Sequence, residues 1–197
     1  MQIDYYLGLT SPFTYLGHAR FEELARRHNT AVHYRPIKVH EIFAVSGGVP
    51  VGQRSSQRQA YRLMELRRWR DFLGLPLNLE PRHFPVPDAG AARMVIAAGQ
   101  SGAHPAALIL GYLRAVWAEE RDISDPETIR AVAAENGYDA DGLARAVAGE
   151  AAEAEYDANT SQAIERRVFG VPTWCIGEEL YWGQDRIAFV ERRLQSG

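Results

Sequence analysis

The strongest constraint on the fold is that strand-like patterns occur only near the two ends of this 197-residue chain. Near the N-terminus, apolar and polar residues alternate over residues 2–9, and a second strand-like run, AVHYRPI, covers residues 31–37. Between them, residues 12–28 have an amphipathic helical pattern. Strand, helix and strand in such close succession predict a βαβ unit with a parallel pair of strands.

The strand signal returns only near the C-terminus. Two short runs, VPTWCIG and EELYWG, meet at Gly177 and predict a β-hairpin. The hairpin residues Trp174, Tyr181 and Trp182 are expected in the core, and Cys175 is expected to be a buried apolar filler. A final helix is expected over residues 184–195, with Asp185 as its N-cap.

Almost all of the middle of the chain has a helical pattern. Neither end has enough strands to be stable alone, so we expect the ends to form one domain, residues 1–43 and 160–197. Residues 44–159 would then be an inserted helical domain. The predicted fold class is α/β, with the order βαβ…ββα and a large all-helical insertion.

Composition and charge exclude several classes of function. The net charge of −3 argues against a nucleic-acid partner. No apolar run approaches the ~20 residues that span a membrane, and the N-terminus lacks a basic-then-apolar signal segment. The single cysteine allows no intramolecular disulfide, and the six histidines lack metal-ligand spacing. We therefore expect a cytoplasmic protein without a metal site.

Ser11 and Pro12 stand where the first strand gives way to the first helix, and they allow two interpretations. Ser11 is a good N-cap, because its hydroxyl can accept a bond from an unpaired N–H group of the first turn. Pro12 suits the first helical position, where its missing N–H costs nothing. Alternatively, the positive end of the helix dipole beside Ser11 would stabilise a thiolate placed there.

Four motifs resemble the 2-hydroxychromene-2-carboxylate isomerases, a thioredoxin-fold family related to disulfide oxidoreductases and kappa-class glutathione transferases. They are SPFTYL, AYRLMELRRW, HFPV and FGVPTWCIGEELYWGQDRIAFVE, which begin at residues 11, 60, 83 and 169. The resemblance covers essentially the whole chain. Redox relatives carry a Cys-x-x-Cys pair where this chain has Ser11 and Thr14, so the resemblance implies no dithiol–disulfide exchange at this site.

The resemblance implies that bound glutathione supplies the thiol and that Ser11 donates a hydrogen bond to it. Val171 and Pro172 resemble the cis-proline turn of the fold, whose backbone would pair with glutathione; an ordinary trans proline is the alternative. Gln184 and Asp185 correspond to the turn that holds the γ-glutamyl end, with Asp185 at its ammonium group. Arg58 stands where relatives often have a lysine that binds a glutathione carboxylate, although a solvated arginine would explain it nearly as well.

The chain departs from the family pattern in two loops. Relatives often have an asparagine in the loop that reads SGGVP here, which contains Gly47 and Gly48. They often have another after FPV, where this chain has Pro87. These differences leave part of the glutathione contacts and the substrate identity open.

The resulting hypothesis is a glutathione-dependent isomerase. The resemblance implies interconversion of 2-hydroxychromene-2-carboxylate and trans-o-hydroxybenzylidenepyruvate, or of a similar aromatic 2-oxo acid, as in naphthalene breakdown. Reversible addition of the thiolate would let a double bond rotate. Two alternatives stay open: a kappa-like glutathione transferase, and a glutathione- or peptide-binding module without turnover. A homodimer is a further hypothesis that the sequence does not test.

Overall fold

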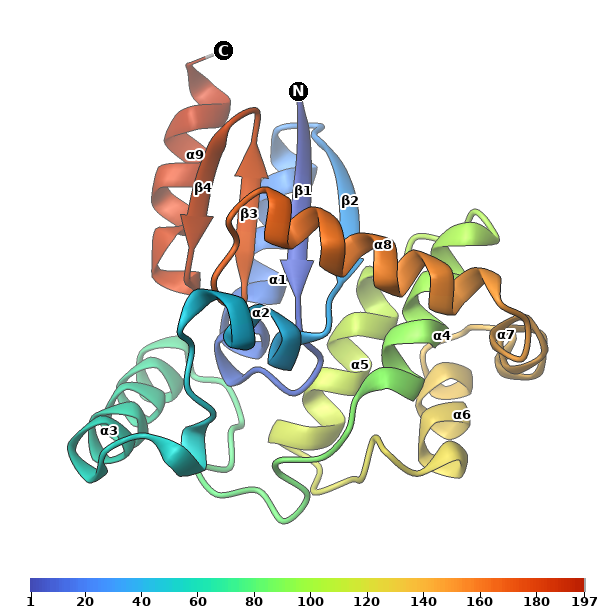
Figure 1. Cartoon of the computed structure of the whole chain (residues 1–197), viewed down its shortest axis with the longest axis horizontal. Helices are drawn as coiled ribbons and strands as arrows, with labels where there is room; N and C mark the ends of the chain where they lie inside the picture. Colours follow the sequence, from blue (N-terminus) through green and yellow to red (C-terminus); the bar gives the residue numbers. More distant parts are fainter. Residues whose placement is uncertain (197) are drawn as a thin grey trace.

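The computed structural model describes residues 1–196 and contains a four-stranded mixed sheet in the order β2-β1-β3-β4 (Figure 1). The central strand β1, Gln2–Leu7, is parallel to β2, Ala31–Pro36, and antiparallel to β3, Thr173–Ile176. Strand β3 forms a hairpin with β4, Glu179–Trp182. The predicted fold class and all four predicted strands are therefore confirmed. Residue 197, the last of the predicted discontinuous domain, lies outside the described residues.

Helices cover both faces of this sheet (Figure 1). On one face lie α1, Pro12–Arg27, and α9, Ile187–Gln195; on the other lie α8, Ala151–Glu165, and α2, Val39–Ser46. Strand β1 serves both faces, because successive side chains of a strand point in opposite directions. Tyr5 packs in the larger apolar cluster with α1, whereas Tyr6 packs in a smaller cluster with Ile42 and Cys175.

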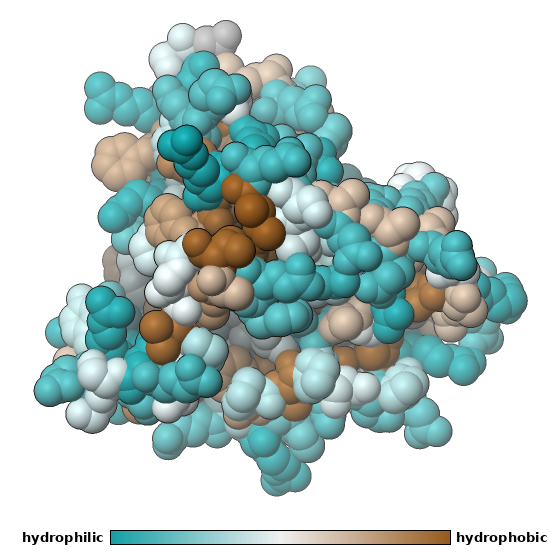
Figure 2. Space-filling view, viewed as in Figure 1, coloured by the Kyte–Doolittle hydropathy of each residue, from teal (hydrophilic) through white to brown (hydrophobic). Residues whose placement is uncertain are grey.

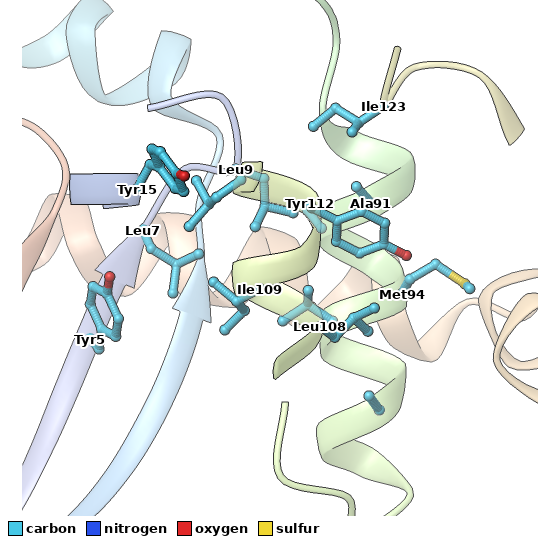
Figure 3. Packing of buried hydrophobic residues seen from close by; sticks show 14 of the residues in the cluster. Tyr5, Leu7, Leu9, Tyr15, Ala91, Met94, Leu108, Ile109, Tyr112 and Ile123 are labelled. Carbon is cyan, nitrogen blue, oxygen red and sulfur yellow. The ribbon is translucent and has the colours of Figure 1, made fainter. Parts of the chain in front are cut away.

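The remaining helices form the lower and right-hand parts of the molecule in Figure 1. They are α3, Ser56–Leu73; α4, Ala89–Gln100; α5, Ala106–Trp117; α6, Pro126–Glu135; and α7, Ala140–Val147. Figure 3 shows that β1 and its loop share a core with α5 and α4. Leu7 and Leu9 lie on one side, Ile109 and Tyr112 of α5 come next, and Met94 of α4 lies beyond them. Helix α8 runs through residue 160, so the expected boundary falls within a helix, and the domain division stays a prediction.

Two local features differ from the sequence-based expectation. Helix α2 was not predicted; Ile42 anchors it in the smaller core, and Thr160 Oγ1 accepts a hydrogen bond from the backbone N–H of Lys38, just before the helix, at 3.0 Å. At the C-terminal end, a 3₁₀ turn over Gln184–Arg186 precedes α9. The prediction that Asp185 caps this helix is wrong, because the turn places Arg186 at the N-cap position without a side-chain cap. None of the helices in residues 1–196 is long and apolar enough to cross a membrane.

Candidate active site

Ser11 is the N-cap of α1, and its hydroxyl hydrogen is still free. The Ser11 Oγ accepts a hydrogen bond from the backbone N–H of Thr14 at 3.2 Å. No acceptor for the Ser11 hydroxyl hydrogen is present among the described residues, and its side chain is half-buried. A hydroxyl can accept and donate at the same time, so capping α1 does not prevent Ser11 from donating to a ligand.

The loop before Ser11 touches two other parts of the site through Gly8. A Cβ added at Gly8 would lie 2.9 Å from Cγ2 of Val39 and 3.4 Å from Cγ2 of Val171. The absence of a side chain at Gly8 therefore allows Val39 of α2 to pack against the backbone that leads into α1, and Val171 lies at contact distance from the same position. This contact brings residues from three distant parts of the sequence to the start of α1.

The Val171–Pro172 peptide bond is cis. The Pro172 carbonyl accepts a hydrogen bond from the backbone N–H of Gly183 at 2.9 Å, which ties this segment to the end of the hairpin. Within the described part of the chain, the backbone N–H and C=O of half-buried Val171 form no hydrogen bond. Unpaired backbone groups beside a sheet are able to bind an extended peptide as an additional strand.

Gln184 and Asp185 have different environments although they are neighbours. Gln184 is buried against α1; its Oε1 accepts a hydrogen bond from Arg20 Nη1 at 2.7 Å. Asp185 is exposed and forms an ion pair with Arg186 at 2.8 Å. Such an exposed pair contributes at most about 1 kcal/mol, so the Asp185 carboxylate can exchange this partner for a ligand.

Arg58 lies apart from the other predicted residues, on the first turn of α3. Its side chain is exposed and forms no ion pair or hydrogen bond in residues 1–196, while its backbone N–H reaches the capping oxygen of Ser55 at 3.5 Å. Helix α3 is held beside α1 partly by the guanidinium of Arg20, which lies 5.5 Å from the ring centroid of Trp69. The structure thus groups Ser11, Val171–Pro172 and the 184–185 turn around α1, and leaves Arg58 on a neighbouring helix.

Asp88 is a supporting residue that the sequence did not single out. Its Oδ2 accepts a hydrogen bond from the backbone N–H of Leu9 at 3.1 Å and so holds the loop before Ser11. Burial raises the pKa of Asp88, while hydrogen bonds from the backbone of Leu9 and Thr10 act in the opposite direction. The only sequence signal was its place beside Pro87, where relatives often have an asparagine.

The glycine loop and Pro87 have local structural explanations. Gly47 ends α2 in the left-handed conformation, with φ of 76°, which glycine adopts without strain. Gly48 packs so closely on Phe43 that an added Cβ would lie 2.2 Å from its ring. Pro87 is exposed. None of the three brings a side-chain hydrogen-bonding group to the site.

The hairpin residues are not all in the core. Trp174 is fully buried, and Tyr181 is half-buried. The expectation for Trp182 is wrong: it is 50% exposed and pairs with Phe169, itself 44% exposed, at a centroid distance of 4.7 Å. Strand β4 is an edge strand that α8 does not reach, so the face of β4 on the α8 side is not covered by that helix (Figure 1). Figure 2 shows hydrophobic surface near the C-terminal end of α8, beside this hairpin.

Cys175 is buried, as expected. Burial raises the pKa of its thiol to about 11, so the thiolate that nucleophilic attack requires is scarce at neutral pH. The buried Cys175 thiol is therefore poorly suited to act as a nucleophile.

Comparison with known proteins identifies the family. The DSBA-like thioredoxin domain matches residues 2–195. The chain is 33% identical to 2-hydroxychromene-2-carboxylate isomerase of Pseudomonas putida, over 98% of this chain and 94% of that protein. The chain belongs to the 2-hydroxychromene-2-carboxylate isomerase family.

Further relatives agree with this assignment. The isomerase of the same name from Sphingobium xenophagum is 32% identical over 98% of this chain and 97% of its own length. A solved structure of 2-hydroxychromene-2-carboxylate isomerase superposes with a TM-score of 0.82 at 32% identity and covers 99% of this chain and 95% of its own. The protein is thus an isomerase with a DsbA-like thioredoxin fold that has Ser11 at the start of α1.

Proposed function

We propose that this isomerase uses glutathione to interconvert 2-hydroxychromene-2-carboxylate and trans-o-hydroxybenzylidenepyruvate, or a similar aromatic 2-oxo acid. The observation that carries the proposal is the free hydroxyl hydrogen of Ser11 at the N-terminus of α1, beside the unpaired backbone of Val171. Together they offer one donor for a sulfur and one strand edge for a peptide. The names of the relatives supply the substrate class.

The residues of the site fit glutathione in three ways. The N–H and C=O of Val171 are available to pair with its extended backbone. The Asp185 carboxylate is exposed and suited to its ammonium group, in place of the pair with Arg186. Arg58 has no partner among the described residues and is suited to a carboxylate. These are the roles that the sequence resemblance implies, and they stay proposals.

Ser11 and α1 would control the state of the sulfur. The positive end of the helix and the Ser11 O–H group both favour an anion over a neutral thiol, so both lower the thiol pKa from about 8.5. Bound glutathione would supply the nucleophile that adds reversibly to a conjugated carbon of the substrate and lets the former double bond rotate. Asp88 would keep the Ser11 loop in position through the N–H of Leu9.

An ultraviolet assay of 2-hydroxychromene-2-carboxylate tests the proposal. An isomerase converts many equivalents of substrate with a catalytic amount of glutathione and leaves the total thiol unchanged. A kappa-like transferase would consume glutathione stoichiometrically, and a binding module would change neither spectrum nor thiol. Conversion at the full rate without glutathione would also refute the proposal.

A matched control separates the external thiol from the internal one. Cys175→Ala should keep most of the activity, because the buried thiol does not enter the chemistry, although a small cavity costs some stability. Loss of turnover in a folded, glutathione-binding Cys175→Ala protein would make Cys175 the nucleophile instead.

A further inference from the structure

Arg62 is a buried cation without an anionic partner. It lies on α3 one turn after Arg58, and its side chain is only 9% exposed. No ion pair or hydrogen bond of its guanidinium is present in residues 1–196, and its Nη2 is buried without any partner. The guanidinium carbon lies 5.3 Å from the ring centroid of Phe84 and 5.6 Å from that of Trp117.

Aromatic rings alone do not explain this arrangement. Cation–π contacts offset part of the desolvation of a buried charge, but they leave the guanidinium N–H donors unpaired. Burial lowers the pKa of Arg62 to about 10, so the side chain is still charged at neutral pH. Buried charges in proteins are normally paired, so the unpaired N–H donors of Arg62 are suited to bind an anion.

The neighbouring charges also favour an anion. Arg54 lies close enough to lower the pKa of Arg62 further, and Arg58 acts on Arg54 in the same way. Among the described residues, none of these three arginines forms an ion pair with a carboxylate; Glu65, the acidic residue of this part of α3, pairs with Arg68 instead. The cluster of Arg54, Arg58 and Arg62 therefore has an uncompensated positive field.

Helix α3, which carries Arg58 and Arg62, packs beside α1, the helix that Ser11 caps. Figure 1 shows α3 and the segment that follows it below the start of α1. Phe84, which contacts Arg62, is four residues from Asp88, a chain distance of at most ~14 Å, and Asp88 binds the loop at Leu9. The segment between Phe84 and Asp88 thus links the surroundings of Arg62 to the residue that holds the Ser11 loop.

We propose that Arg62 binds the carboxylate of the aromatic acid substrate, with Arg54 adding to the field. This assignment rests on the proposed function, in which Arg58 takes the carboxylate of glutathione. A guanidinium forms two parallel hydrogen bonds with a carboxylate, which would orient the acid as well as attract it. Arg62 would then select acids over neutral aromatic compounds of the same shape.

Binding of a non-reacting pair of probes tests this without turnover. 2-Naphthoate and its neutral amide, 2-naphthamide, have nearly the same shape, and their affinities are measured by calorimetry in the presence of glutathione. The wild-type protein should prefer the carboxylate. Arg62→Met should weaken 2-naphthoate binding by about 10- to 100-fold, the usual value of a charged hydrogen bond, and leave 2-naphthamide and glutathione affinities unchanged. Arg62→Lys keeps the charge but not the paired donors, so its affinity for 2-naphthoate should lie between those of the wild type and Arg62→Met.

The control is Arg67→Met, on the exposed side of the same helix, which should change none of these affinities. Equal affinity of the wild type for both probes would overturn the proposal, even if Arg62→Met fails to fold. A loss of glutathione affinity alone would also overturn it, because the bound carboxylate would then belong to glutathione. The wild type could select 2-naphthoate through Arg62 without isomerising 2-hydroxychromene-2-carboxylate; the proposed function would then fail while the acid site stands. Conversely, if the wild type isomerises this substrate and Arg62→Met binds 2-naphthoate as tightly as the wild type, the acid site fails while the proposed function stands.

Discussion

At the scale of single residues, Ser11 caps α1 and, in the proposed function, also donates a hydrogen bond to the glutathione sulfur. Its oxygen satisfies the N–H of Thr14, one of the backbone groups that every helix start leaves unpaired. Its hydroxyl hydrogen is donated to no acceptor in residues 1–196 and is available to a ligand. The two roles use different atoms, so a substitution at Ser11 should affect two measurable quantities independently.

Ser11→Ala should lower the free energy of unfolding by about 0.5–2 kcal/mol through loss of the cap. It should also raise the pKa of bound glutathione's thiol and reduce turnover near neutral pH, by up to about 10²–10³, the value of an oxyanion donor. Thiolate absorbance and the isomerase assay measure both effects.

The matched control is Asp125→Ala, which removes the cap of remote α6, where Asp125 accepts bonds from the N–H groups of Glu127 and Thr128. It should lower stability to a similar extent without changing the thiol pKa. If Ser11→Ala behaves in the same way as this control, Ser11 is only a cap and the proposed mechanism is wrong.

At the scale of elements, the contact between α1 and the 184–186 turn decides where the proposed ammonium-binding residue lies. Gly17 faces Gln184 so closely that an added Cβ would lie 2.7 Å from its Cβ and 3.4 Å from its Cα. These atoms belong to the start of a buried side chain and to the backbone, so they cannot rotate away. Arg20, one turn further along α1, fixes the same glutamine by its hydrogen bond to Oε1.

Gly17→Ala should therefore destabilise the protein, because steric overlap in a packed region costs about 1–3 kcal/mol and exceeds the roughly 1 kcal/mol gained from helix propensity. Displacement of the turn should also move Asp185 and weaken glutathione binding, measured by calorimetry. Gly99→Ala in α4 is the control, since nothing lies within 4 Å of its added Cβ, and it should be neutral or stabilising. A Gly17→Ala protein with unchanged glutathione affinity would show that the turn does not position the ligand.

At the scale of the whole molecule, α1 also carries buried titratable groups that the proposed mechanism does not use. A cavity of about 510 Å³ lies between α1, β2 and the start of α5, lined in part by His18, Glu22 and Tyr34. Burial raises the pKa of Glu22 to about 7, and the bond that Tyr34 donates to it at 2.8 Å only partly opposes this. Burial lowers the pKa of His18 to about 4. The other titratable groups that line the cavity are Glu23, Arg26 and His104.

These shifts predict how stability depends on pH. The folded state holds the Glu22 proton more tightly than the unfolded state. The contribution of protonated Glu22 to the free energy of unfolding is therefore fully present below pH ~4.5 and is lost as pH rises through about 7. His18 acts in the opposite sense. The contribution of its neutral form to the free energy of unfolding is present above pH ~6.5 and is lost as pH falls toward about 4. Glu22→Gln removes only the first effect.

Urea unfolding at several pH values tests this. Relative to the wild type, Glu22→Gln should gain stability as pH rises from about 5 to 8.5, by roughly 1–3 kcal/mol for a pKa shift of this kind. The His18 effect is common to both proteins and cancels in the difference. Parallel stability curves for the two proteins would mean that Glu22 titrates normally in the folded state.

Local sequence patterns determined much of this protein. Alternation over residues 2–9 and three short strand-like runs predicted the four strands, Ser11 and Pro12 predicted the start of α1, and four motifs indicated the family, because each of these depends on neighbouring residues. The expected roles of Arg58, Gln184 and Asp185 in glutathione binding stay predictions, and the cap assigned to Asp185 was wrong because a 3₁₀ turn over Gln184–Arg186 moved the N-cap position to Arg186.

Only the tertiary structure decided which distant residues meet. The support of the Ser11 loop by Asp88, the contact of Gly17 with Gln184, and the aromatic surroundings of Arg62 all join residues far apart in the sequence. Local patterns also did not predict exposure. Trp182 is a residue type expected in the core, but it lies on an edge strand that α8 leaves uncovered. The physical reason is that periodicity tells which side of an element is apolar, whereas burial and pairing depend on which other element packs against that side.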